Sequence, residues 1–183
     1  MRFKILKEQT AYSGKELRSG WVEEKTGIVG DAAVGFVGPC HVATEDLVDL
    51  DDARAGTYIH SASMAHVIVE HHRCTLDLGV ARQRLLVVLL CEVLRDGDRA
   101  VRRDGDDVYY GDRKLTVSIA APAPESTVIH FGINIDPDGA PVPAIGLDEM
   151  GVEPRALLEK LLERYVGEIQ ACEYAASKVR QAP

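Results

Sequence analysis

The 183 residues predict a single α+β domain over residues 1–183, with a mostly antiparallel central sheet and helices on one side. Two observations carry this prediction. Helical patterns dominate the first half, and four short strand patterns then follow one another between about residues 100 and 135, before a final helical pattern. Strands in quick succession pair as antiparallel neighbours, whereas a parallel sheet needs strands and helices that alternate.

The first quarter of the chain supplies two strand patterns and one helical pattern. Residues 3–6 predict a short first strand, and residues 32–37 predict a buried strand that ends at Gly38-Pro39. Residues 15–25 place apolar side chains at helical spacing, and Gly27 is a stop signal for that helix.

Two more helices are expected before residue 75. Thr44 resembles the start of a short helix. Residues 60–72 are expected to form a helix, because apolar side chains recur there at helical spacing. Its N-cap is Ser61 or Ser63, and its inward stripe comprises Met64, Val67, Ile68 and His71.

The second half holds two long helices with the strands between them. Residues 79–95 predict a helix that lies deep across a sheet, because residues 85–90 are apolar nearly all round. Pro154 fits the first turn of the last helix, residues 154–178. The expected strands are residues 100–103, 106–110, 113–120 and 126–135. The expected buried stripe of the last helix is Leu158, Leu162, Tyr165, Ile169, Cys172, Ala176 and Val179.

The acidic composition excludes some classes of partner. Asp and Glu number 29 against 21 Lys and Arg, so the formal charge is −8, whereas a protein held to nucleic acid by phosphate contacts needs a basic surface. The longest apolar run, residues 85–91, is far shorter than the roughly 20 residues of a membrane span, and the N-terminus has no apolar signal region. We therefore expect a cytoplasmic protein with a small-molecule ligand and without a nucleic-acid or membrane partner. A homodimer is left open.

The four cysteines lie far apart and form no C-x-x-C pair, which predicts reduced thiols rather than a disulfide framework. Cys91 and Cys172 fall in helical apolar stripes and are expected in the core. Cys40 follows Gly38-Pro39 in a predicted loop and is the candidate reactive thiol, although a structural role is favoured there.

Alternation along the last strands gathers polar side chains on one face of the sheet. We expect a tight turn at Gly111-Asp112, and a hairpin whose loop, residues 121–125, keeps its two prolines outside the ladder. Pairing Ala120 with Ser126 places Thr116 opposite His130. Gly132 then leaves a gap beside the lysine where a ligand can approach. The shared face comprises Asp107, Tyr109, Lys114, Thr116, Ser118, His130 and Asn134.

This mixture of groups favours a binding site over a solvated sheet face, which remains the alternative. Lys114 suits an anionic or carbonyl oxygen. Asp107 is placed to hold that lysine or a ribose hydroxyl, and His130 to shuttle a proton or donate a hydrogen bond. The basic residues Arg102, Arg103, Arg113 and Lys114, all within residues 102–114, predict a locally cationic pocket.

At these residues the chain resembles known families. Residues 106–115 are similar to the segment of lipoate–protein ligases that runs Asn-Asp-Ile, two or three residues, Gly, basic, Lys, Ile, and residues 129–132 resemble the strand that follows it. The Gly132–Ile135 piece is similar to a Gly-Ile-Asn strand of biotin ligases. Over nearly its full length the chain resembles domain-of-unknown-function family 366. The recurrent pieces of that family stand here at residues 38–40, 48–52, 102–107 and 114–120.

The resemblance implies a fold shared with lipoate and biotin protein ligases and class II aminoacyl-tRNA synthetases, and a lysine that contacts an acyl-adenylate. The expected function is an enzyme of ligase or acyltransferase type that binds a small carboxylic acid, or its adenylate or thioester. In this hypothesis Lys114 stabilises the acyl-phosphate or carbonyl oxygen, Asp107 orients that lysine, and His130 shapes the pocket. The expected substrate-binding residues are Thr116, Ser118, Gly132, Asn134, Arg102, Arg103, Gly38, Cys40 and His66, with Cys40 a conditional covalent acceptor.

One departure keeps a second hypothesis open. Lipoate ligases carry an Arg-Arg-x-x-Gly-Gly-Gly loop, and residues 36–41 stand here in its place by chain order, with one glycine, a proline and no arginine. A non-catalytic small-molecule or nucleotide-binding protein of the same fold is therefore the alternative. The length leaves no room for a second substrate domain.

Three polar clusters have both a structural and a functional interpretation. His66 and Glu70 are four residues apart, but the zinc signatures built on such a pair are not met, so a structural or pocket role is favoured over a metal site. The acidic cluster Asp46, Asp49, Asp51 and Asp52 is either a solvated face or a Mg²⁺ site that serves ATP. The second cluster, Asp104, Asp106 and Asp107, has Arg102 and Arg103 beside it, which either receive a phosphate or balance the aspartates.

Overall fold

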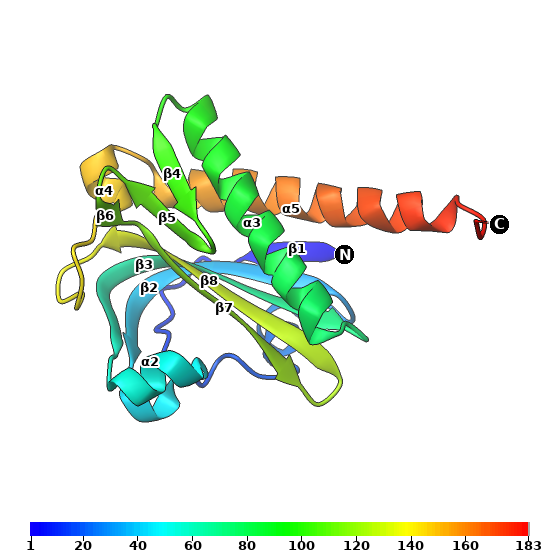
Figure 1. Cartoon of the computed structure of the whole chain (residues 1–183), viewed down its shortest axis with the longest axis horizontal. Coiled ribbons are helices and arrows are strands. Elements are labelled where there is room, and N and C mark those ends of the chain that lie inside the picture. Colours follow the sequence, from blue (N-terminus) through cyan, green and yellow to red (C-terminus); the bar gives the residue numbers. More distant parts are fainter. Residues whose placement is uncertain (183) are drawn as a thin grey trace.

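A five-stranded sheet forms the centre of the molecule, in the order β1-β2-β3-β8-β7. The computed structural model describes residues 1–182 (Figure 1). Strand β1 pairs in parallel with β2, and the other neighbours are antiparallel, so the predicted α+β class with a mostly antiparallel sheet is confirmed. The strands are β1 (Arg2–Ile5), β2 (Ala32–Val42), β3 (Ile59–His72), β7 (Thr116–Ala123) and β8 (Ser126–Asp136).

A second, three-stranded sheet consists of β4 (Val101–Asp104), β5 (Asp107–Tyr110) and β6 (Arg113–Lys114). The turn predicted at Gly111-Asp112 is present, with Tyr110 paired to Arg113. The predicted continuous strand over residues 113–120 is wrong. It divides at Leu115, which is fully buried and donates its N–H to the Val108 carbonyl, so β6 and β7 belong to different sheets.

The helix predicted at residues 60–72 is instead β3, the central strand of the main sheet. Both faces of a central strand are covered, so its sequence shows no alternation, and a run such as Val67–Val69 fits a helix stripe equally well. Ser61 caps no helix; its hydroxyl donates to the carbonyls of Ser63 and Asp136.

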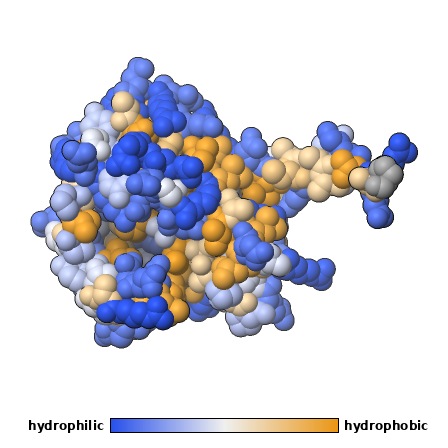
Figure 2. Space-filling view, viewed as in Figure 1, coloured by the Kyte–Doolittle hydropathy of each residue, from blue (hydrophilic) through white to orange (hydrophobic). Residues whose placement is uncertain are grey.

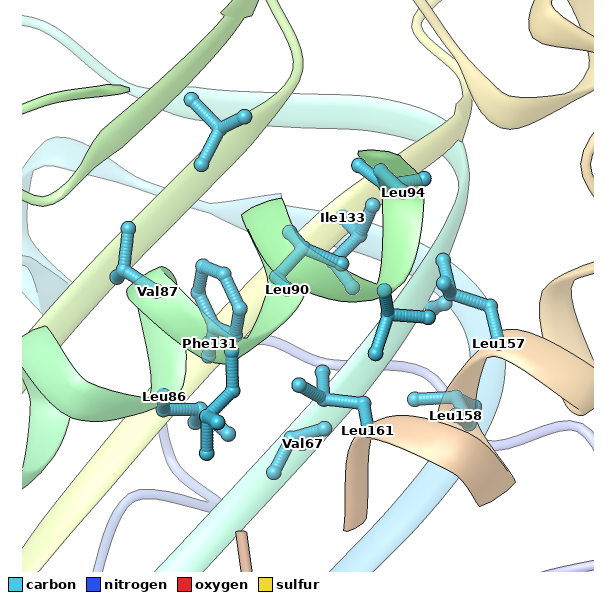
Figure 3. Packing of buried hydrophobic residues seen from close by; sticks show 14 of the residues in the cluster. Val67, Leu86, Val87, Leu90, Leu94, Phe131, Ile133, Leu157, Leu158 and Leu161 are labelled. Atoms are coloured by element: carbon cyan, nitrogen blue, oxygen red, sulfur yellow. The ribbon is translucent and has the colours of Figure 1, made fainter. Parts of the chain in front are cut away.

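Helices α3 (Leu76–Asp96) and α5 (Pro154–Ser177) cover one face of the main sheet (Figure 1). Both match the predicted helices, and Pro154 occupies the first turn as expected. Figure 3 shows leucines of the two helices, including Leu90 and Leu161, directed toward Phe131 and Ile133 of β8 and Val67 of β3. This packing forms the larger hydrophobic core.

The opposite face is covered in part by the N-terminal segment, residues 6–28, with α1 (Trp21–Thr26). The helix expected over residues 15–25 is thus shorter and later, but it ends at Gly27 as predicted. Buried Glu70 of β3 holds this segment, because its carboxylate accepts hydrogen bonds from the Ser19 hydroxyl and the Gly20 amide. The remaining short elements are a 3-10 helix (Thr44–Asp46), α2 (Leu50–Ala55) and α4 (Leu147–Met150).

The second half of α5 projects beyond the sheet (Figures 1 and 2). The predicted stripe is buried from Leu158 to Ile169, but Cys172, Ala176 and Val179 are exposed, the last at 71%. The helix continues past the sheet that it packs against, so the apolar side chains near its C-terminal end have no core to pack into. Within residues 1–182, no helix is both long and apolar enough to cross a bilayer.

Replacing Gly79 by Ala tests the crossing of α3 over β8. Alanine favours helix formation by about 1 kcal/mol over glycine, but a Cβ at this buried position collides with the Thr127 side chain. We expect the free energy of unfolding to fall by about 1–3 kcal/mol, measured by urea denaturation.

The matched control is Gly167→Ala on the exposed face of α5, where a Cβ meets nothing within 4 Å. This substitution should raise the stability by up to about 1 kcal/mol. Adding Thr127→Ser to Gly79→Ala removes the colliding methyl group and keeps the hydroxyl that donates to the Cys74 carbonyl, so it should restore stability. Equal effects of the two Gly→Ala changes would contradict the packing described.

Candidate active site

The register between β7 and β8 decides which side chains share a face. The predicted pairing of Ala120 with Ser126 is wrong, since Ala123 pairs with Ser126 and Ala120 with Ile129. The loop is correspondingly shorter, and Pro122 lies within the strand, which an edge strand tolerates. The pairing register of β7 against β8 therefore differs from the prediction by an odd number of residues. Such a shift moves every β7 side chain to the opposite face of the sheet relative to the side chains of β8.

Thr116 therefore pairs with Ile133, and Ser118 pairs with Phe131, on the side of helix α3. Both hydroxyls have structural partners. Thr116 Oγ1 accepts the Val108 N–H at 2.9 Å, and Ser118 Oγ accepts from Gln83 at 2.7 Å. The two residues still border the pocket at the edge of the sheet, but they are not on the face of His130 and Asn134 as predicted.

A cavity of about 350 Å³ opens on the other face of the sheet, between the N-terminal segment, α2 and the loop after β8. Its buried floor includes Tyr12, Met64 and His130, whereas Tyr58 and Val142 are exposed at its mouth. Of the predicted site residues, the cavity brings together Asp107, Lys114, Thr116, Ser118, His130 and Asn134. The predicted site residues outside its lining are Gly38, Cys40, His66, Arg102, Arg103 and Gly132.

Lys114 is held at the wall of this cavity by both its side chain and its backbone. Its Nζ lies 2.9 Å from Asp107 Oδ1, and about a quarter of each side chain is exposed. The Lys114 amide donates to the Pro143 carbonyl, and its carbonyl accepts from the Ile145 amide. The Asn134 side chain also donates to the Lys114 carbonyl, at 3.4 Å, so Asn134 supports the backbone that carries the ammonium group.

The two arginines expected to bind substrate are engaged elsewhere. Arg102 lies over the Tyr109 ring and pairs with Asp104 at 3.5 Å. Arg103 donates to the Gly105 carbonyl. Arg113 pairs with Glu149 on the surface. Of the predicted cationic cluster, Lys114 alone reaches the pocket within residues 1–182, so the locally cationic pocket is not present.

Carboxylates dominate the charge of the lining instead. Asp46, Asp49, Asp52, Asp106 and Asp107 all border the cavity. Asp106 pairs with Arg84 at 3.1 Å, and Asp49 caps α2 by accepting from the amides of residues 51 and 52. Asp46 lies 4.0 Å from Lys15 at the surface. Of the acidic cluster identified in the sequence, Asp46, Asp49 and Asp52 therefore border the pocket, whereas Asp51 is exposed and pairs with Arg54. No three His, Cys, Asp or Glu side chains within residues 1–182 are grouped to hold a metal ion alone.

Two buried histidines, His130 in the floor and His66 behind it, are joined in a line of hydrogen bonds. His66 Nε2 is 3.2 Å from the Gly38 carbonyl oxygen, and His66 Nδ1 is 3.0 Å from His130 Nε2. Burial lowers the pKa of His66 to about 3, against the opposing effect of the Gly38 carbonyl. Burial also lowers the pKa of His130 well below its usual range, and proximity to His66 adds to the effect. The Tyr12 ring stacks on His130 at 3.7 Å between centroids.

Gly38, Cys40 and Gly132 serve packing in this fold. Any side chain at Gly38 would collide with the Thr10 backbone, and the space above Gly132 is filled by the Met64 sulfur, so the expected gap there is absent. Cys40 lies within β2 rather than in a loop and is fully buried. Burial raises the pKa of its thiol to about 12, which opposes a thiolate and the covalent role.

Tyr12 and His60 line the pocket, although neither was predicted from the sequence to do so. Tyr12 stands outside every long periodic segment, and it is held against the sheet by its isolated parallel bridge to Cys40 and by the stacking of its ring on His130. His60 was assigned to the start of a helix. Its position in β3, beside His41 on the neighbouring strand at 3.2 Å, follows from the strand pairing.

Solved structures of biotin and lipoate protein ligases share this fold. The biotin protein ligase of Aquifex aeolicus in complex with biotin and ATP is 15% identical and superposes with a TM-score of 0.61, over 92% of this chain and 70% of that chain. Protein Ta0514 of T. acidophilum with bound lipoic acid, named as a candidate lipoate protein ligase, is 14% identical with a TM-score of 0.57, over 92% and 85%. These likenesses define the fold as that of the ligase catalytic cores.

Residues 1–180 match the family described as Domain of unknown function (DUF366), and the chain belongs to this family. It is 35% identical over 177 residues to the uncharacterized protein MJ0805 of Methanocaldococcus jannaschii, covering 92% of this chain and 80% of that protein. A protein of unknown function from Pyrococcus horikoshi is also 35% identical, with a TM-score of 0.94 over 99% of this chain and 100% of that chain. The resemblance drawn from the sequence is confirmed.

The buried histidines predict a specific loss of stability in acid. Between pH 6.5 and pH 5 the unfolded chain protonates His66, near its ordinary pKa of about 6.5, while the folded chain does not. The unfolded state then binds more protons, so stability falls as the pH falls, by about 2 kcal/mol at pH 5 for this one residue.

The measurement is the free energy of unfolding in urea at pH 7 and pH 5, for the wild type and His66→Gln. Glutamine keeps one donor for the Gly38 carbonyl and one acceptor for His130, but it does not titrate. The wild type should lose about 2 kcal/mol more than the variant over this range. Identical losses would show that His66 is not held neutral by burial.

Proposed function

We propose that this protein is an enzyme of ligase or acyltransferase type that binds a small carboxylic acid, or its adenylate or thioester, in the pocket lined by Lys114. The observation that carries the proposal is the ammonium group of Lys114 at the wall of a cavity of about 350 Å³. That volume lies within the usual range for small-molecule sites. The ligase-like fold supports the same assignment.

Lys114 would act on the charged oxygen of the acyl group. An ammonium group that is already held in place stabilises negative charge that develops on an acyl-phosphate or carbonyl oxygen, and it needs little reorganisation to do so. Partial burial strengthens this interaction relative to water. Asp107 and the Asn134 contact keep the lysine at the wall, so they are positioning residues in this proposal.

The acidic lining of the pocket affects how a nucleotide could bind there. Five carboxylates would repel the phosphates of ATP unless a cation accompanied them. Carboxylate oxygens are ligands that Mg²⁺ prefers, and Mg²⁺ needs one or two of them together with phosphate oxygens. Asp46 and Asp52 border the pocket and fit that requirement, and the cation would supply the neutralising charge for the phosphates.

A second candidate is a non-catalytic small-molecule or nucleotide-binding protein. Two observations favour it: Lys114 is already paired with Asp107, and no arginine is among the pocket-lining residues within residues 1–182. Two reactions separate the candidates: release of pyrophosphate from ATP as a small carboxylic acid becomes its adenylate identifies a ligase, and release of the free thiol from an acyl thioester identifies an acyltransferase. A binding protein gives neither.

Ligand stabilisation of the wild type and Lys114→Ala tests the site. A thermal-shift screen with ATP, AMP, Mg²⁺ and small carboxylic acids should find compounds that stabilise the wild type. Removing the ammonium group should weaken their binding by about tenfold or more, because a hydrogen bond to a charged group contributes about 1.5–3 kcal/mol.

The matched control is Arg113→Ala. It removes the neighbouring cation, which pairs with Glu149 on the surface outside the pocket, and it should bind as the wild type does. If nothing stabilises the wild type, the acyl-adenylate proposal fails. If the wild type and Lys114→Ala respond alike, the ligand lies elsewhere.

A further inference from the structure

The hydrogen bonds beneath the pocket determine which nitrogen of each histidine carries a proton. The Gly38 carbonyl can only accept, so His66 Nε2 must donate to it. A neutral imidazole carries one proton, so His66 Nδ1 is an acceptor. His130 Nε2, which lies 3.0 Å from that nitrogen, must therefore be the donor. The chain of bonds has one direction.

This direction leaves His130 Nδ1 as a bare acceptor. Within residues 1–182 no hydrogen bond is made to this nitrogen. In the same residues every side-chain nitrogen or oxygen that is sealed from solvent has a hydrogen-bond partner. Nδ1 therefore retains a small solvent-accessible area, although His130 as a residue is only 2% exposed. Since His130 borders the cavity, this nitrogen is accessible at the pocket floor.

We propose that the floor of the pocket binds an uncharged N–H or O–H group of the ligand, which donates to His130 Nδ1. This inference rests on the proposed function for the other end of the ligand, the carboxyl group near Lys114. It names the substrate class more closely: carboxylic acids whose far end carries a neutral hydrogen-bond donor, such as an amide, a urea or a hydroxyl group.

The surroundings of His130 explain the preference for an uncharged donor. The aromatic ring of Tyr12 stacks on one side of the imidazole, and Met64 and Ile119 lie in the same lining. An ammonium group would lose its hydration in these surroundings, at a high cost. A purely apolar tail would leave Nδ1 without a partner, which disfavours alkyl acids.

The two ends of the pocket are separated along β8. Asn134, which contacts the Lys114 carbonyl, is four residues from His130, or roughly 13 Å at the ordinary rise of a strand. In this proposal the ligand spans a comparable length between the two groups. Eight-carbon acids are suitable probes.

The experiment compares octanoic, 8-hydroxyoctanoic and 8-aminooctanoic acids by calorimetry. The wild type should bind 8-hydroxyoctanoate roughly fivefold to tenfold more tightly than octanoate, with the amino acid weakest. His130→Phe keeps a ring to stack on Tyr12 but has no acceptor, so it should remove or reverse that preference. Lys114→Ala should weaken both octanoate and 8-hydroxyoctanoate by a similar factor and leave their ratio unchanged.

Two measurements on the wild type need no variant at the floor. Nitrogen-15 NMR should show both His66 and His130 protonated on Nε2 at neutral pH. The cyclic amide 2-pyrrolidinone, which has an N–H, should shift the His130 resonances more than cyclopentanone, a ring of the same shape without a donor. Protonation of His130 on Nδ1, or equal shifts by the two rings, would overturn the inference.

The outcomes separate the two proposals. Equal binding of octanoate and 8-hydroxyoctanoate overturns the floor inference and leaves the proposed function standing. Failure of all three acids, with a clear response of His130 to 2-pyrrolidinone, overturns the carboxylic acid proposal and supports the acceptor at the floor. Failure of both the acids and the lactam overturns both.

Discussion

The burial of strand β3 on both faces is the constraint on which the rest of the structure depends. This strand lies between β2 and β8, and three of its almost completely buried polar side chains are the titratable residues His66, Glu70 and His71. A buried polar group without a partner costs about 1–3 kcal/mol, and more if it is charged. Each of the three must therefore find its partners inside the fold. Glu70 and His71 bind other segments to the sheet, whereas the partners of His66 lie in the neighbouring strands β2 and β8.

The partners of these residues connect the layers. Glu70 holds the N-terminal segment through Ser19 and Gly20. On the opposite face, His71 bonds to the Tyr165 hydroxyl of α5 at 2.8 Å and to Asp31 at 3.0 Å. His66 completes the set by joining the Gly38 carbonyl to His130. Strand β3 thus positions the floor of the pocket through the bond from His66 to His130.

The same constraint explains where the sequence could and could not predict the fold. Helices α3 and α5 were predictable because each has a long helical pattern with clear end signals. Strand β3 was not, because a strand with two buried faces lacks the period of two that identifies a strand. His66 and Glu70 were read as neighbours on a helix. Both remain on one face in the strand, since residues four apart also share a face there.

The pocket itself was predicted in part, for a related reason. Lys114 and Asp107 were correctly placed on one face, because the tight turn at Gly111-Asp112 determines the register of their strands from local sequence. Of the two partners considered for Asp107, the structure has the lysine. The register between β7 and β8 depends instead on whether Pro122 lies inside the strand, and that is allowed only because β7 is an edge. The edge position of β7 is set by the order of strands in the whole sheet, so it cannot be predicted from the local sequence.

The net charge of −8 is also reflected in the lining of the pocket, where aspartates outnumber basic residues. Basic residues are concentrated near Lys114 in the sequence, but alternation and the turn direct Arg102 and Arg113 to partners outside the pocket. The aspartates of the 3-10 helix and α2, distant in sequence, are brought to its mouth by the fold. One ammonium group therefore faces several carboxylates and a neutral histidine acceptor. Such a lining disfavours a ligand with several bare negative charges and favours one with a single acidic end and neutral donors elsewhere.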